Sequence, residues 1–145
     1  MNPQTDLQTS IEARLNTMRI IWIALILSVG IYYMITFFVQ RSPDVAPNST
    51  LSLALAVAAV STIAVSFLIK AKLLGKALEQ QKIGMVQQAY ITTWAITEVA
   101  ALLGLLDFFS TGDRYYHVFF AFAALGLLLH MPRREHVAGA MFKSI

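Results

Sequence analysis

Cysteine is absent from this chain of 145 residues. Its absence excludes disulfide bonds, thiolate metal sites and a thiol nucleophile. Charged residues are also scarce: they make up 13% of the chain, whereas hydrophobic residues make up 57%. An ordinary globular domain carries about 25% charged residues. The composition therefore argues against an ordinary soluble domain and indicates a polytopic membrane protein.

The sequence also lacks the motifs that common enzymes carry. It has no glycine-rich phosphate loop, no nucleophile paired with a base and no cluster of metal ligands. Obvious inverted or direct repeats, on which many secondary transporters are built, are missing as well. We therefore expect a protein that is not an enzyme, and we expect no cofactor and no metal.

Apolar segments dominate what is present. A hydrocarbon core of about 30 Å is crossed by about 20 helical residues, and four segments approach that length: 20–39, 51–69, 89–109 and 115–131. They predict an all-α fold, residues 1–145, in which four transmembrane helices form one antiparallel bundle. Residues 132–145 are expected to form a cytosolic tail.

The first 18 residues are mostly polar but carry one apolar stripe. Leu7, Ile11, Leu15 and Met18 are spaced by four, four and three residues, which is the period of a helix face. We expect an amphipathic helix here, either lying on the membrane surface or extending the first span into the cytosol.

Basic residues are distributed unevenly along the chain. Nine of the eleven lie before the first span, between the second and third spans, or after the fourth, whereas Arg41 and Arg114 lie on the other side. The positive-inside rule therefore predicts cytoplasmic termini, and we expect the inner (plasma) membrane of a bacterium. Anionic lipid headgroups account for the basic residues, so the expected partner is the bilayer and not a nucleic acid.

Glu98 lies near the middle of the third span. An acidic side chain at this depth costs about 2.5–3.5 kcal/mol on insertion scales, so it is a functional hypothesis by default. Because a low dielectric disfavours the charged form, we expect Glu98 to hold a proton. Ser61 and Thr62, at similar depth in the second span, are the expected partners of this ion-binding site, and Ser28 in the first span is another candidate donor.

Small residues at helical spacing predict where helices pack closely in lipid. They occur in both the second and the third span, so we expect these helices to contact one another and the second to be central in the bundle. Gly84 is the expected turn between them. The predicted packing residues are Ala54, Ala58, Thr93, Thr97, Ala101 and Gly104.

His117 and His130 are candidate haem ligands in the fourth span. Thirteen residues separate them, about 19 Å along a helix, so they cannot ligate one centre within one chain. Haem ligation would need a second copy. We expect each histidine near a membrane boundary, with His130 a cation at the helix end, and we expect Asp107 at the outer boundary in contact with water.

The segment 97–105, TEVAALLGL, resembles the carboxylate helix of the proteolipid c subunit of rotary ATP synthases. In that family an ion-binding acid is followed six and seven residues later by Gly-Leu, here Glu98, Gly104 and Leu105. The resemblance covers residues 51–109 and implies that Glu98 binds a proton or sodium ion between neighbouring copies. The chain departs from the family in two additional helices and in the absence of its Arg-Gln-Pro loop.

These patterns lead to two classes of function. The first is an accessory or assembly subunit of a larger membrane complex, bound to other subunits or to copies of itself, with a buried, protonatable Glu98. The alternative is a subunit that handles protons or sodium ions through Glu98. Short external loops favour the first class, because a receptor would present more chain to solvent.

Overall fold

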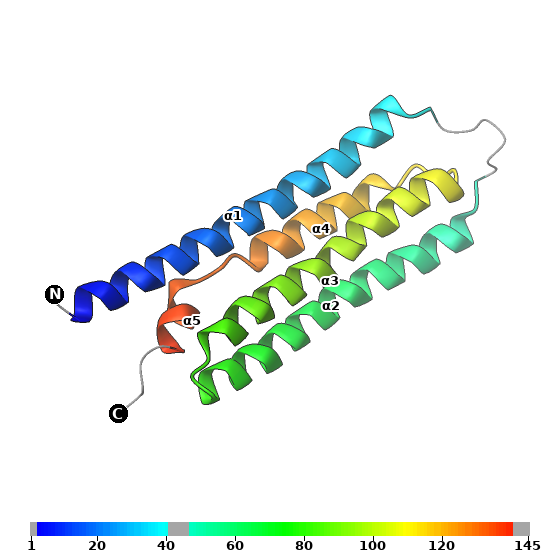
Figure 1. Cartoon of the computed structure of the whole chain (residues 1–145). Helices are drawn as coiled ribbons and strands as arrows, with labels where there is room; N and C mark the ends of the chain where they lie inside the picture. The colour runs from blue at the N-terminus through cyan, green and yellow to red at the C-terminus, as the bar shows by residue number, and fades with distance from the viewer. Residues whose placement is uncertain (1–2, 41–46, 141–145) are drawn as a thin grey trace.

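The structure, a computed structural model, describes residues 3–40 and 47–140, with the side chains of residues 3–7 left out. All regular secondary structure in this part of the chain is helical. Figure 1 shows α1 to α4 running alternately up and down a single bundle, with short α5 at one end. The helices are α1 (Pro3–Phe38), α2 (Ser49–Glu79), α3 (Ile83–Ser110), α4 (His117–Leu129) and α5 (Arg134–Gly139).

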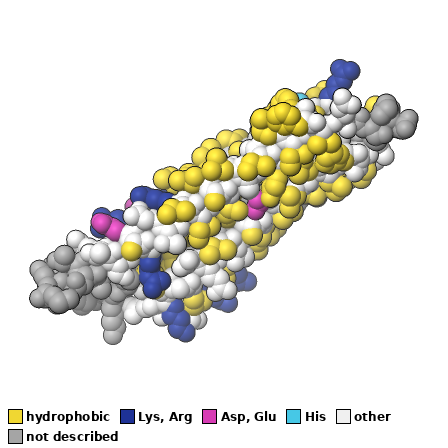
Figure 2. Space-filling view, turned by 45° about the horizontal axis from the view of Figure 1, so that its top comes forward, with side chains coloured by type: hydrophobic (Ala, Val, Ile, Leu, Met, Phe, Trp, Pro, Cys, Tyr) yellow, Lys and Arg dark blue, Asp and Glu magenta, His cyan; other side chains and the backbone are white. Residues whose placement is uncertain are grey.

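The basic end of the bundle is defined here by the start of α1, the α2–α3 turn and α5 (Figure 1). The opposite end carries the α1–α2 and α3–α4 connections. Figure 2 shows Lys and Arg side chains gathered mainly towards the basic end, while hydrophobic side chains cover much of the remaining surface. This separation of charge and apolar surface along the bundle axis is typical of a membrane protein.

Three helices are long and apolar enough to cross a membrane: Gln8–Phe38, Ser49–Glu79 and Ile83–Ser110. The all-α prediction is therefore confirmed, and these lengths are consistent with a membrane protein. The fourth predicted span, 115–131, is shorter than expected. α4 has 13 residues, about 20 Å of helix, because the chain ahead of it is a turn and Pro132 lies just after its last residues.

The N-terminal segment extends the first span. α1 is one continuous helix of 36 residues, so the polar segment from residue 3 onward and the first apolar segment form a single helix. Ile11, Leu15 and Met18 are all buried, as the apolar stripe predicts, whereas the side chain of Leu7 lies outside the described part. The stripe faces the protein because this half of α1 contacts α5.

α3 is the central helix of the bundle. This helix contacts α1, α2 and α4, whereas α2 has no comparable contact with α1 among the described residues. In their most apolar windows 44% of α3 is buried, compared with 17% of α2 and 11% of α1. The prediction that the second helix is central is therefore wrong. Small side chains lie on more than one face of α3, so several helices can approach it closely.

The face of α2 that packs differs from the predicted one. Ala54 and Ala58 are exposed, and the buried small residues are Ser52, Ala59 and Ser66. These three recur every seven residues, the period of helices that cross at about 20°. The pair predicted from the sequence, Ala54 and Ala58, are four residues apart. Because Ala58 is about 100° around the helix from Ala59, this pair lies outside the buried stripe.

Gly104 packs closely against α4. A Cβ atom built on Gly104 would lie 2.8 Å from the Cβ atom of Phe119, and one built on Gly126 of α4 would lie 2.7 Å from Cγ2 of Thr97. Thr93, Thr97, Ala101 and Gly104 are all buried, as predicted. Their strip, however, includes the closest approach of α3 to α4, because the two glycines stand on facing helices.

The α2–α3 turn lies at Gln81, ahead of the predicted Gly84. The Gln81 amide donates to the Leu78 carbonyl and the Lys82 amide donates to the Ala77 carbonyl, at 3.2 Å each. These two bonds form a Schellman motif, which requires a left-handed residue between helix and loop. Gln81 supplies it with a φ of 51°. Gly84 lies in the first turn of α3.

Replacing Gln81 with glycine is expected to stabilise the protein. A side chain in the left-handed region costs about 1–2 kcal/mol that glycine avoids, although glycine also loses more entropy on folding. The thermal unfolding midpoint in detergent should therefore rise. Gly84→Ala tests the alternative turn: it should not lower the midpoint, since nothing lies within 4 Å of the added Cβ. A lower midpoint for Gln81→Gly would contradict this account of the turn.

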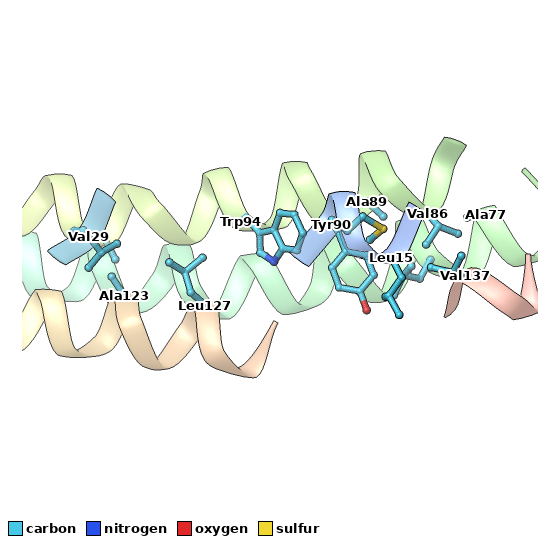
Figure 3. Packing of buried hydrophobic residues seen from close by; sticks show 14 of the residues in the cluster. Leu15, Val29, Ala77, Val86, Ala89, Tyr90, Trp94, Ala123, Leu127 and Val137 are labelled. Carbon is cyan, nitrogen blue, oxygen red and sulfur yellow. The ribbon is translucent and has the colours of Figure 1, made fainter. Parts of the chain in front are cut away.

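A hydrophobic core at the basic end fixes α5 against the long helices. Figure 3 shows Leu15, Val86 and Val137 close together near Tyr90 and Ala77. Val137 of α5 is fully buried, although α5 has only six residues. Because α5 is too short to be stable alone, this packing must hold it in place.

Candidate functional site

Glu98 is held by two hydroxyl groups from α1. Ser28 Oγ donates to Glu98 Oε1 at 2.5 Å, and the Tyr32 hydroxyl donates to the same oxygen at 3.1 Å. The donors are four residues apart, so they lie on one face of α1. Ser28 is one of the candidate donors named from the sequence. Tyr32 was missed, although its spacing from Ser28 is a signal that would have found it.

The second carboxyl oxygen of Glu98 is open. Oε2 has no hydrogen-bond partner among the described residues, and the side chain as a whole is partly exposed. The site therefore combines one carboxyl oxygen that two hydroxyl groups hold with one carboxyl oxygen that has no partner in the described part of the chain.

Ser61 and Thr62 take no part in this site. Ser61 is exposed and donates to the Val57 carbonyl at 2.7 Å, while Thr62 donates to the Ala59 carbonyl at 2.8 Å. The predicted three-residue ion site is therefore not formed. The reason is the position of α1, which lies against the Glu98 face of α3 and supplies the donors that α2 was expected to supply.

A second polar site lies at the basic end, where α4 stops. His130 is completely buried there. Its Nε2 lies 2.8 Å from Ser66 Oγ, and its Nδ1 lies 3.4 Å from Lys70 Nζ. One arrangement satisfies every group: Lys70 donates to Nδ1, Nε2–H donates to Ser66, and Ser66 donates to the Ile63 carbonyl at 2.6 Å. In this arrangement the imidazole is neutral.

Tyr90 connects α5 to the same site. Its hydroxyl lies 2.6 Å from His136 Nδ1 and accepts the Arg133 amide at 3.1 Å. Lys70 Nζ lies over its ring, 4.7 Å from the centroid, where the π face attracts a cation. Tyr90 thus joins α2, α3 and the α4–α5 connection through one side chain.

Two indole groups complete the end of α4. Trp94 Nε1 donates to the His130 carbonyl at 3.0 Å, and Trp22 Nε1 donates to the Leu127 carbonyl at 2.7 Å. The last carbonyls of a helix have no partner within it, and here they lie inside the protein. The expectation that His130 is a cation at the helix end is wrong, because the side chain is completely buried and its Nδ1 faces Lys70 Nζ.

Asp107 is buried as well, contrary to the expectation of a water-exposed boundary residue. Its exposed fraction is 0%, and Oδ1 accepts a hydrogen bond from Thr111 Oγ1 at 2.9 Å. Oδ2 has no partner within the described residues. The last turn of α3 is covered here by the chain that leads into α4, since Phe108 and Tyr116 stack with ring centroids 4.9 Å apart.

No group of three or more His, Asp or Glu side chains that could hold a metal ion occurs in residues 3–40 and 47–140. Comparisons with models of protein families, with curated proteins and with solved structures find no match. The functional argument therefore depends on the geometry of Glu98 and of the basic end.

Acidification is expected to loosen α5. Burial lowers the pKa of His136, and the nearby Lys70 and Arg133 lower it further, against a smaller opposite effect of Glu135. An undocked His136 binds a proton near its ordinary pKa of about 6.5, whereas a docked one resists it. The docked state therefore loses stability as pH falls below that value.

The measurement is hydrogen exchange of the Val137 amide at about pH 7.5 and about pH 5.5, on either side of the ordinary histidine pKa, corrected for the intrinsic pH dependence of exchange. Protection in the wild type should fall at the lower pH. His136→Gln keeps an acceptor for Tyr90 but does not titrate, so its protection should change less. An equal fall in both proteins would assign the effect to another group.

Proposed function

We propose that this chain is an accessory or assembly subunit of a larger membrane complex, with Glu98 as a protonated structural residue. The observation that carries the proposal is the pair of hydrogen bonds from Ser28 and Tyr32, which ties α1 to α3 within one chain. Only 11% of the most apolar window of α1 is buried. A carboxyl group used in this way serves the arrangement of helices and leaves Oε2 for a neighbouring subunit.

The exposed apolar surface of α1 supports association with other chains. The exposed residues lie along the apolar half of the helix, so the contact would extend over about 26 Å of it. In lipid such surfaces associate through close packing and hydrogen bonds, and the open oxygen of Glu98 adds a polar contact near the middle. The exposed residues include Ile20, Ile23, Leu27, Ile31, Met34 and Phe37.

Four membrane crossings with both termini in the cytoplasm of a bacterium complete the proposal. In it α4 and its flanks, residues 115–131, make the fourth crossing, and the basic end faces the cytoplasm. A cysteine in place of the exposed Gly75, near the tip of the α2–α3 hairpin, should react with an impermeant reagent only in permeabilised cells. Labelling in intact cells would overturn the orientation.

Substitutions at Glu98 test the structural role. Glu98→Gln keeps an oxygen that accepts from both hydroxyls, so the unfolding midpoint and the co-purifying chains should stay as in the wild type. Glu98→Leu leaves the Tyr32 hydroxyl without its acceptor, while Ser28 keeps the Leu25 carbonyl at 2.8 Å, and it should lower the midpoint by the equivalent of about 1–3 kcal/mol. The control is Leu102→Gln, which adds an amide on the exposed face of the same helix.

The alternative function, a subunit that takes up and releases a proton or sodium ion, is favoured by the open Oε2 and by the resemblance to the c subunit helix. It predicts that Glu98→Gln assembles normally but abolishes ion-coupled activity of the complex. It also predicts that a carbodiimide, which attacks protonated carboxyls, labels the wild type and not the Gln variant. Full activity of the Gln variant, with no labelling of the wild type at any pH, would exclude it.

A further inference from the structure

A cavity of about 450 Å³ lies between α2 and α4 towards the opposite end of the bundle. Its volume falls within the range of about 300–1,000 Å³ typical of small-molecule sites. The α2 side of its wall extends from Ser49 to Ala59, about 15 Å along the helix axis. The cavity is therefore elongated along the direction in which lipid chains run in a bilayer.

The cavity exists because small residues of α2 face aromatic residues of α4. Ser52, Ala56 and Ala59 line one wall, and Phe119 and Phe122 line the other. Phe119 also packs against α3 at Gly104. The cavity is open at the molecular surface, since Leu53, Tyr115 and Phe122 of its wall are exposed, so an apolar molecule can enter it from the surrounding lipid.

Polar groups occur at one end of the cavity only. Ser49 and Asp113 line that end, and a hydrogen bond of 2.7 Å from the Asn48 amide to the Thr111 carbonyl holds the two sides together. Leu53 and Phe122 line the apolar remainder. A molecule that fits this arrangement has one polar end and one hydrocarbon chain.

Ser52 lies in the wall just below the polar end, and its chemistry indicates which group of the bound molecule lies there. Its side chain is 7% exposed, and its hydroxyl makes no hydrogen bond to the described residues. Asp107 Oδ2 is the buried side-chain atom that lacks a partner in this part of the chain, so the Ser52 hydroxyl is accessible and can donate to an acceptor in the cavity. Ser52 is in the first turn of α2, at a depth that suits an ester carbonyl lying just below a headgroup.

We propose that the cavity binds one acyl chain of a phospholipid with a zwitterionic headgroup. The Ser52 hydroxyl donates to the ester carbonyl, the chain lies between α2 and α4, and the headgroup ammonium lies near the Asp113 carboxylate. An anionic headgroup is disfavoured by the same carboxylate. This inference requires insertion in a bilayer but is independent of the role of Glu98.

Native mass spectrometry of the full chain, delipidated and then mixed with phosphatidylethanolamine or phosphatidylglycerol, tests the site. One phosphatidylethanolamine should be retained, and more of it than of phosphatidylglycerol. Ala56→Phe fills the cavity and should abolish retention, whereas Ala58→Phe, on the exposed face of α2, should leave it unchanged. Ser52→Ala should weaken binding about fivefold, the ratio that corresponds to a hydrogen bond worth about 1 kcal/mol.

Equal retention by the wild type, Ala56→Phe and Ser52→Ala would overturn the proposal, as would a wild type that retains no phospholipid. Loss in Ala58→Phe equal to that in Ala56→Phe would also overturn it, because the lipid would then lie on the outer face of α2. Because Ser52→Ala removes only one oxygen, its result stands even if Ala56→Phe fails to fold. Preference for phosphatidylglycerol would overturn the contact with Asp113.

Discussion

Gly104→Ala is expected to destabilise the protein by about 1–3 kcal/mol, the usual cost of overpacking a close contact. The added methyl group would lie 2.8 Å from Phe119 Cβ and 3.2 Å from the Phe120 ring. A Cβ atom is attached directly to the backbone, so Phe119 cannot move away by changing its rotamer. α3 and α4 must separate instead. The thermal unfolding midpoint in detergent measures the loss.

Gly75→Ala is a matched control, for which we expect the opposite change in stability. Nothing lies within 4 Å of a Cβ at that position, and alanine in place of glycine inside an exposed helix gains about 1 kcal/mol. Gly126→Ala should resemble Gly104→Ala, because its methyl group would meet Thr97. If Gly104→Ala raised the midpoint as Gly75→Ala does, the close approach of α3 and α4 would be refuted.

Trp94→Phe is expected to cost about 1–3 kcal/mol, the penalty for a buried polar group that loses its partner. The indole of Trp94 is completely buried and donates to the His130 carbonyl, for which no other donor is found in the described part of the chain. Phenylalanine preserves an aromatic side chain but removes this donor. The loss should appear in the unfolding midpoint and as increased exchange of amides around Leu127.

Trp22→Phe provides the comparison. Trp22 is only half-buried, and the Leu127 carbonyl to which it donates also accepts the His130 amide at 3.1 Å. This carbonyl keeps a partner after the substitution, so the destabilisation should be smaller than for Trp94→Phe. Equal effects of the two substitutions would mean that aromatic packing, and not the hydrogen bond, holds the end of α4.

Sequence patterns predicted the parts of the fold that are adjacent to water. The stripe of Ile11, Leu15 and Met18 was identified correctly because polar residues surround it and mark the face that is buried. There the contrast between polar and apolar residues carries the information.

The same patterns were less informative inside the apolar spans. A helix that is hydrophobic on every side does not indicate which face meets a neighbour, so Ala54 and Ala58 were preferred over Ser52 and Ala59. The partners of Glu98 depend on which helix lies beside α3. Ser28 and Ser61 lie at similar depth in their spans, so the sequence made them equally good candidate partners of Glu98. Only the three-dimensional arrangement shows that Ser28 is the partner.

The end of α4 has a consequence for the order of events during biosynthesis. Its last residues contact Trp22 of α1, Ser66 and Lys70 of α2, and Trp94 of α3. Because a chain is made from its N-terminus, these contacts can form only after the three long helices have emerged. The fourth helix can therefore complete the bundle but cannot begin it, and a nascent chain that stopped before His130 would leave Lys70 and Trp94 without the partners that the end of α4 supplies.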